Sequence, residues 1–331
     1  MCIRDSTMSK SILSGCGPAL SLAALALVAS SALLASPALA TENGTQHYPI
    51  GVNSVGDGYL PPPGMLQLLD YFQVSTNPVT VNGAGAKSVP KFDLAAEADA
   101  MRLLYTWPAM IGPFHYTTGF VQPFVNLDLN VEGHKGHDFD LGDIDIQNYL
   151  GYHNADHSFA YFFGLDTYIP TGHYRQKDMI NVGSNYYTFA PNVNMTWVAT
   201  KKLTFDAALF AEFNTTNTSD KYHSGDDVDL DYGITYRPLA NVPQFGLGVN
   251  GFFYKQVSDD TQYGAMVASD GYRGQEFAIG PQFRYDIPFG GIVLKYQHDF
   301  DVKNRPRGEK LWLEFATPIF GAPKEPAHPA L

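Results

Sequence analysis

The sequence predicts an all-β fold: a transmembrane antiparallel β-barrel of about twelve strands, with an N-terminal segment that can fold into the lumen. Three observations predict it. Polar and apolar residues alternate along many segments of strand length, long and short connections take turns between these segments, and aromatic residues are abundant although no helix-sized apolar run follows residue 40.

The alternation is clearest in the stretch 203–237. In its first arm Leu209 falls on one face and Glu212 on the other, and in its second arm Leu230 and Asp231 are divided in the same way. A period of two over about ten residues is typical of a strand with one polar and one apolar face. Two such arms around a polar loop predict an antiparallel hairpin.

Twelve stretches of this kind follow residue 64. The stretch 92–107 fits least well because Arg102 breaks either face, and a bulge there would restore the alternation. The predicted strands are 65–76, 92–107, 114–130, 141–152, 158–169, 185–199, 203–213, 227–237, 245–257, 273–286, 291–301 and 309–318.

The connections are sorted by length. Most of those after odd-numbered strands are long and polar, namely 77–91, 131–140, 170–184, 214–226 and 258–272, and those after even-numbered strands are shorter, namely 108–113, 153–157, 200–202, 238–244 and 287–290. Outer-membrane barrels have long extracellular loops and short periplasmic turns. A secreted β-sandwich, the plainer alternative, has no reason for this sorting.

Composition narrows the class of protein. The chain has 20 Tyr, 22 Phe and 31 Gly, only 16% charged residues, and a net charge of −12 without a basic patch, so nucleic acid is not an expected partner. Both cysteines, Cys2 and Cys16, lie within the first 40 residues, so we expect no disulfide or thiolate metal site after them.

The chain divides into four predicted parts. Residues 1–40 hold an adapter-like start and a secretory signal peptide that ends in a small-x-small cleavage pattern at Ala38-Leu39-Ala40, so the mature chain begins at Thr41. Residues 41–64 are irregular, 65–320 form the barrel, and 321–331 are a Pro-rich tail. The irregular part is either a surface tail or a hatch in the lumen, with His47, Tyr48, Asn53, Asp57 and Tyr59 as hatch residues.

Strand parity predicts which side chains face the lumen. They either pair with one another and fill the interior, or line a polar path that sets selectivity. Aromatic residues with the same parity would suit an apolar ligand. The predicted lumen residues are Asp128, Asp143, Asp145, Asp166, Glu212, Asp229, Asp231, Arg237, Arg284, Lys295, Glu314, Phe162, Tyr168 and Phe210.

Other motifs favour plainer interpretations. His134 and His137 could bind a metal, but solvated loop residues are the preferred interpretation. The acids of 226–231 alternate in a way that could hold calcium, yet Asp229 and Asp231 are better explained as lumen-facing strand positions. The adjacent pair His223-Ser224 is no evidence of a catalytic relay. We therefore expect no metal, no cofactor and no catalytic residue.

Several stretches resemble the outer-membrane proteins of the meta-pathway phenol-degradation family, which includes sphingosine-induced outer-membrane proteins. They are residues 42–53, 60–64, 185–192, 222–226, 248–251, 295–298 and 304–308. The resemblance implies a barrel in the outer membrane of a Gram-negative bacterium that passes hydrophobic or aromatic compounds.

The partners implied are outer-membrane lipid and lipopolysaccharide, the outer-membrane assembly machinery, and a small hydrophobic or aromatic solute. A structural or adhesive barrel with a sealed, charge-paired lumen is the alternative function, and an outer-membrane hydrolase is a further one.

Overall fold

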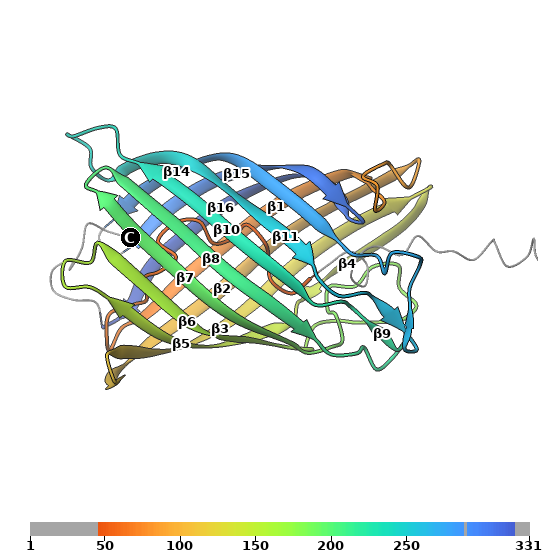
Figure 1. The fold of residues 1–331 in the computed structure, drawn as a ribbon, viewed down its shortest axis with the longest axis horizontal. Coiled ribbons are helices and arrows are strands. Elements are labelled where there is room, and N and C mark those ends of the chain that lie inside the picture. The colour runs from red at the N-terminus through yellow and green to blue at the C-terminus, as the bar shows by residue number, and fades with distance from the viewer. Residues whose placement is uncertain (1–45, 288–289, 322–331) are drawn as a thin grey trace, which may run out of the picture. The chain divides into compact units, whose positions relative to one another are not determined.

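The computed structural model describes residues 46–287 and 290–321 (Figure 1). The predicted signal peptide, and the predicted tail beyond Gly321, lie outside the described residues.

The described residues form sixteen strands and contain no helix, so none that is long and apolar enough to cross a membrane. The long strands are β1 (Leu66–Thr80), β2 (Phe92–Ile111), β3 (Phe114–Val131), β5 (Ile144–His153), β6 (Phe159–Ile169), β7 (Thr188–Thr200), β8 (Leu203–Asn214), β10 (Asp227–Tyr236), β11 (Phe245–Gln256), β14 (Gln275–Ile287), β15 (Gly290–Lys303) and β16 (Pro306–Phe320). The short ones are β4 (His134–Leu141), β9 (Tyr222–His223), β12 (Thr261–Gln262) and β13 (Ala265–Met266).

The long strands close into one antiparallel barrel. Each pairs with its neighbours in sequence, and β1 pairs with both β2 and β16, with Leu66 opposite Phe320 at the seam. The short β4 continues the place of β5 beside β3, so the barrel has twelve strand positions. Closure satisfies the strand backbones without water. The predicted fold of about twelve antiparallel strands is confirmed.

The two ends of the barrel differ. The long connections, the β3–β4 hairpin and the small sheet β9–β12–β13 lie at one end, here named the long-loop end, and turns such as 112–113 and 201–202 lie at the short-turn end (Figure 1). The stretch 131–140, predicted as a loop, forms this hairpin instead because β4 pairs with β3 over eight residues. The connection between β15 and β16 is only residues 304–305, although it lies at the long-loop end.

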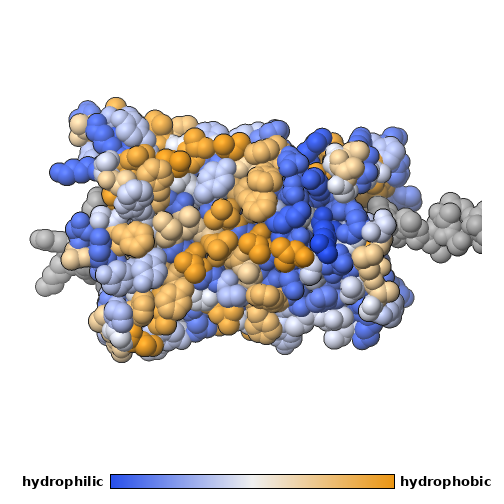
Figure 2. Space-filling view, in the orientation of Figure 1, coloured by the Kyte–Doolittle hydropathy of each residue, from blue (hydrophilic) through white to orange (hydrophobic). Residues whose placement is uncertain are grey.

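The outer face of the barrel is mostly apolar. Residues such as Leu209, Leu230, Ile234 and Leu313 are exposed, whereas their neighbours along each strand are buried. Figure 2 shows apolar residues gathered over the middle and short-turn part of one face, with hydrophilic residues toward the long-loop end. This apolar band is the surface that lipid requires.

In β2 the structure differs from the expected bulge and from the expectation that Arg102 fits neither face. No bulge interrupts the pairing of β2 with β1 from Leu94 to Tyr105, and Arg102 points into the barrel. The alternation looked poor because Glu97 and Asp99 face outward while small alanines face inward. Asp70 on β1 also faces outward and interacts with Asp99, so acids interrupt the apolar band here.

Candidate functional site

Residues 46–64, here named the lumen segment, run inside the barrel (Figure 1). His47 contacts Thr188, the first residue of β7 at the long-loop end, and the Tyr59 hydroxyl donates to the carbonyl of His157 in a short turn at the other end. The segment therefore passes through most of the length of the lumen. A turn is made at Gly51, whose φ of 88° is a left-handed conformation that suits glycine.

Asp231 on β10 is the main anchor of the lumen segment. Its carboxylate accepts hydrogen bonds from the backbone N–H groups of Gly51 (2.8 Å) and Asn53 (2.9 Å) and from the Tyr48 hydroxyl (2.7 Å). The Tyr48 ring stacks on Phe210 of β8 with 3.9 Å between the ring centroids. Hydrogen bonds to a charged acceptor are the stronger kind, so this contact holds the turn firmly.

A second part of the wall, β15, holds the same turn by its carbonyl groups. Lys295 on β15 donates to the carbonyl oxygens of Gly51 (2.9 Å) and Val52 (2.5 Å), and Gln297 donates to that of Gly51 (2.9 Å). Lys295 is fully buried and also pairs with Glu314 of β16. The segment thus joins β10 to β15, which are separated in the sheet by β11 and β14.

His47 fixes the segment near the long-loop end. Its ring nitrogens lie 2.8 Å from Asp143, in the break between β4 and β5, and 2.7 Å from Thr188. Burial raises the pKa of Asp143, but hydrogen bonds from His47 and from the N–H groups of Ser184 and Gly172 outweigh it, so the pKa lies below its usual value. The carboxylate is therefore held in its charged form.

Asp57 lies further along the segment, in an electrostatically unfavourable position. Burial and the neighbouring carboxylate of Asp206 raise the pKa of Asp57 well above its usual value. Asp206 itself accepts hydrogen bonds from the Gly56 N–H (3.0 Å) and from Thr196 (2.6 Å). Here the lumen segment and the wall thus bring two acids close together, Asp57 from the segment and Asp206 from β8.

A cavity of about 310 Å³ remains between the lumen segment and the wall formed by β1 to β6. Tyr48 and Ile50 of the segment line one side, and small or branched residues of β2 and β3 line the other, together with Arg102. The Arg102 guanidinium donates to Gln147 (2.8 Å), Tyr149 (3.1 Å) and Tyr71 (3.3 Å). The small and branched residues of β2 and β3 are Ala96, Ala98, Ala100, Val121, Val125 and Leu127.

The structure brings most of the predicted lumen residues to the interior. All five of the named hatch residues lie on the lumen segment and contact the wall or one another. The inward residues are Asp143, Asp145, Asp166, Glu212, Asp229, Asp231, Arg237, Arg284, Lys295, Glu314, Phe162, Tyr168 and Phe210.

Asp128 is the exception, and its predicted place in the lumen is wrong. Its side chain is 62% exposed and lies 3.0 Å from His137 on the outside of the β3–β4 hairpin. Leu127 and Leu129 are the inward residues there, because apolar residues from the long-loop connections cover them from inside. Polarity alone does not distinguish inside from outside once a strand projects past the lipid.

Sequence reasoning missed the cavity wall. Alanines at 96, 98 and 100 alternate in step with Arg102, and this regular spacing indicates that they face inward with it. Trp312 and Lys310 of β16 were also missed, although both share the parity of Glu314.

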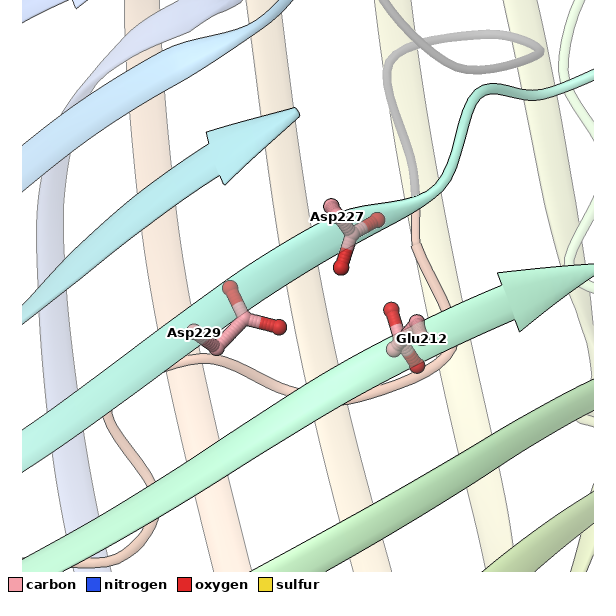
Figure 3. A group of neighbouring side chains, drawn as sticks. All are labelled: Glu212, Asp227 and Asp229. Atoms are coloured by element: carbon pink, nitrogen blue, oxygen red, sulfur yellow. The ribbon is translucent and has the colours of Figure 1, made fainter. Parts of the chain in front are cut away.

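Charge pairing in the lumen is uneven. Within the described part of the chain, five lysine and arginine side chains of its last third form ion pairs in the lumen, and each pairs with an acid that lies after residue 275. They are Arg237, Arg284, Lys295, Arg305 and Lys310. The buried acids of β8 and β10 form no ion pair among the described residues. Three of them, Glu212, Asp227 and Asp229, lie close together (Figure 3).

Fold and site define a transmembrane β-barrel of the outer-membrane type whose lumen is occupied by its own N-terminal segment. The family model described as "Putative MetA-pathway of phenol degradation" matches residues 80–315, and the chain belongs to this family.

A solved outer-membrane channel has the same fold. The COG4313 outer membrane channel from Pseudomonas putida F1 is 17% identical, with a TM-score of 0.71, and the match covers 80% of this chain and 98% of that one. The beta domain of the Bordetella autotransporter BrkA is 8% identical, with a TM-score of 0.47, over 76% of this chain and 98% of that one. No curated protein sequence matches the chain.

Proposed function

We propose that the protein is an outer-membrane channel that passes small hydrophobic or aromatic compounds by passive diffusion, with the lumen segment as its hatch. The observation that carries the proposal is the 310 Å³ cavity between the segment and the β2–β3 wall. A cavity of about 150 Å³ lined by apolar side chains accepts benzene, so this one has room for a substituted aromatic ring. Family membership and the name of the Pseudomonas structure support the same class of function.

The lining suits a ligand that is mostly apolar with one polar group. Alanine and valine side chains offer one flat apolar wall, and the hydroxyl of Tyr71 and the guanidinium of Arg102 lie beside it. A few placed polar groups in an apolar pocket are what fixes the orientation of a bound small molecule. The small size of Ala98, at the middle of the wall, leaves the space open.

The first test is single-channel conductance of the refolded mature protein in planar bilayers, with and without aromatic solutes. We expect a steady conductance that a suitable aromatic compound blocks. Deleting residues 42–63 should raise the conductance, and an unchanged conductance would remove the hatch from the proposal. A barrel silent in both forms would favour the sealed structural role.

A matched pair of substitutions tests the cavity. Ala98→Leu fills the cavity from β2 and should weaken the block by solute, whereas Ala95→Leu adds the same atoms to the outer face of the same strand and should leave it unchanged. Equal effects of the two would argue against the cavity as the solute site. We propose no catalytic role, and alanine at His223, Ser224 or His137 should leave transport intact.

A further inference from the structure

The three acids Glu212, Asp227 and Asp229 meet at the long-loop end of the lumen. Asp227 lies opposite Glu212 in the pairing of β10 with β8, and Asp229 follows two residues along on the same inward face. Figure 3 shows the three carboxylates directed into one space between the two strands. All three side chains are buried, with at most 1% of each residue exposed.

Almost none of their oxygen atoms has a partner. Only Oε1 of Glu212 accepts a hydrogen bond, from the backbone N–H of Tyr48 (2.9 Å). The other five carboxylate oxygens of the three residues have none within the described residues. The guanidinium of Arg305 attracts Asp227 and Asp229 but forms no hydrogen bond to their carboxylates. Burying three carboxylates with so few donors beside this guanidinium is unfavourable, and a bound cation would stabilise them.

Tyr254 is a further buried polar side chain beside these acids, and it interacts electrostatically with all three of them. It lies opposite Asp229 in the pairing of β10 with β11, is fully buried, and its hydroxyl has no hydrogen-bond partner among the described residues. The nearby guanidinium of Arg305 stands 4.1 Å over the Tyr254 ring, and its Nε donates to Glu276. A neutral oxygen left unbonded beside three acids is a further available ligand atom.

The spacing suits one cation. The ligand oxygens of the three acids all lie within 4.8 Å of one another. Calcium accepts a flexible shell of protein oxygens, whereas magnesium demands near-ideal octahedral geometry and keeps several waters, so an enclosed group of side-chain oxygens favours calcium. We propose that Glu212, Asp227 and Asp229, with the Tyr254 hydroxyl, form a binding site for a calcium-sized divalent cation.

The site is connected to the hatch. Glu212 holds the backbone of Tyr48, and Asp231, the next inward residue of β10, holds Gly51 and Asn53. A bound cation removes the repulsion among these acids and thereby stabilises the wall on which the lumen segment rests. Because Glu212, Asp227 and Asp229 are all buried, exchange of the ion should be slow.

The test is calcium binding by the full mature chain refolded in detergent, which leaves lipopolysaccharide out. Metal-free protein is titrated with calcium chloride alone, added before or after refolding, and bound calcium is counted by equilibrium dialysis. We expect one saturable calcium per chain, weaker binding of magnesium, and a loss of affinity of about tenfold or more in Asp227→Asn/Asp229→Asn. Asp145→Asn, another buried inward acid with an unpartnered oxygen, should bind calcium like the unchanged chain.

Absence of saturable binding in the unchanged chain overturns the proposal, and so does binding that the double substitution leaves intact. If the double variant does not refold, Glu212→Gln is measured in its place and must show the same loss. Calcium binding is measured without any solute or current, so its outcome is independent of the channel proposal.

Discussion

The Tyr48 hydroxyl donates a 2.7 Å hydrogen bond to Asp231, a residue 183 positions further along the chain. Asp231 is fully buried, and its other two donors are backbone N–H groups of the same turn. The contact therefore joins the lumen segment to the middle of β10 by side chain and backbone together. Opening the lumen through this segment requires all three bonds to break.

Tyr48→Phe should loosen the hatch while keeping the ring stacked on Phe210. A hydrogen bond to a charged group contributes about 1.5–3 kcal/mol, so the seated form should lose stability of that order. We expect more frequent opening events in single-channel records. Tyr232→Phe removes a hydroxyl from the outer face of the same strand as Asp231 and serves as the control. Identical records for both variants would contradict the anchoring role.

Gly233→Ala should displace the lumen segment. A Cβ atom at this position would lie 1.9 Å from the carbonyl oxygen of Ser54, a backbone atom that cannot turn away. We expect higher conductance and faster proteolysis of the segment in the folded barrel. In a chain that lacks residues 42–63 the same substitution should have no effect, and an effect there would mean that the strand itself is disturbed.

Acid should release the segment at His47. The pKa of Asp143 is lower in the folded protein than in the unfolded chain, so its charged form stabilises the fold above the unfolded value, and that stability is lost as the pH falls through the folded value. We expect the segment to loosen below about pH 4, measured as conductance or protease sensitivity. Asp143→Asn should flatten this dependence.

The control for that measurement is Asp128→Asn, which changes an exposed carboxylate beside His137 on the outer side of the barrel. It should leave the acid response of the unchanged chain in place. A response that persists equally in both variants would assign it to other carboxylates of the barrel.

Asp70→Leu should stabilise the barrel in a bilayer. Asp70 faces outward between Met101 and Phe315, which are both exposed apolar residues in register with it. An acid at this depth costs up to about 1–2 kcal/mol, which leucine would recover as a higher free energy of unfolding. Thr76→Leu, nearer the long-loop end, is the control. A destabilised Asp70→Leu barrel would instead indicate that another molecule binds the acid.

Labels in the connection 215–226 should be accessible on intact cells. This connection lies at the long-loop end, which the proposed location places outside the cell. Labels at residues 201–202 should be inaccessible until the outer membrane is opened. Labelling only at 201–202 would invert the proposed orientation.

The strands were predictable because lipid and lumen impose opposite requirements on alternate residues. In β8 and β10 apolar residues face lipid and mostly polar residues face the lumen at nearly every position. Leu209 and Asp231 could therefore be assigned to the correct face from the sequence. In β2 they are not: alanines face the cavity, and Glu97 and Asp99 face outward. For a strand of this kind, the sequence does not show which alternate residues face the lumen until the neighbouring strands are known.

The contacts of the site were harder to predict than its residues. Strand alternation placed Asp229 and Lys295 inside. It could not show that Lys295 donates to a carbonyl of the lumen segment, or that Asp229 has no hydrogen-bond donor within residues 46–287 and 290–321. Those differences depend on how an irregular segment crosses the lumen, and the hydrophobic period carries no information about that path.

The lumen segment joins directly to β1, which forms the closing seam with β16, and Gly64 lies beside Gly321 at the end of that seam. During biogenesis we expect the segment to lie inside when the first and last strands meet, so that its contacts with β10 and β15 can guide their alignment. A folded passenger fused ahead of the segment would have to cross a lumen that has no room for it. Such a fusion should stall insertion, whereas the same passenger placed in 215–226 should be carried to the surface.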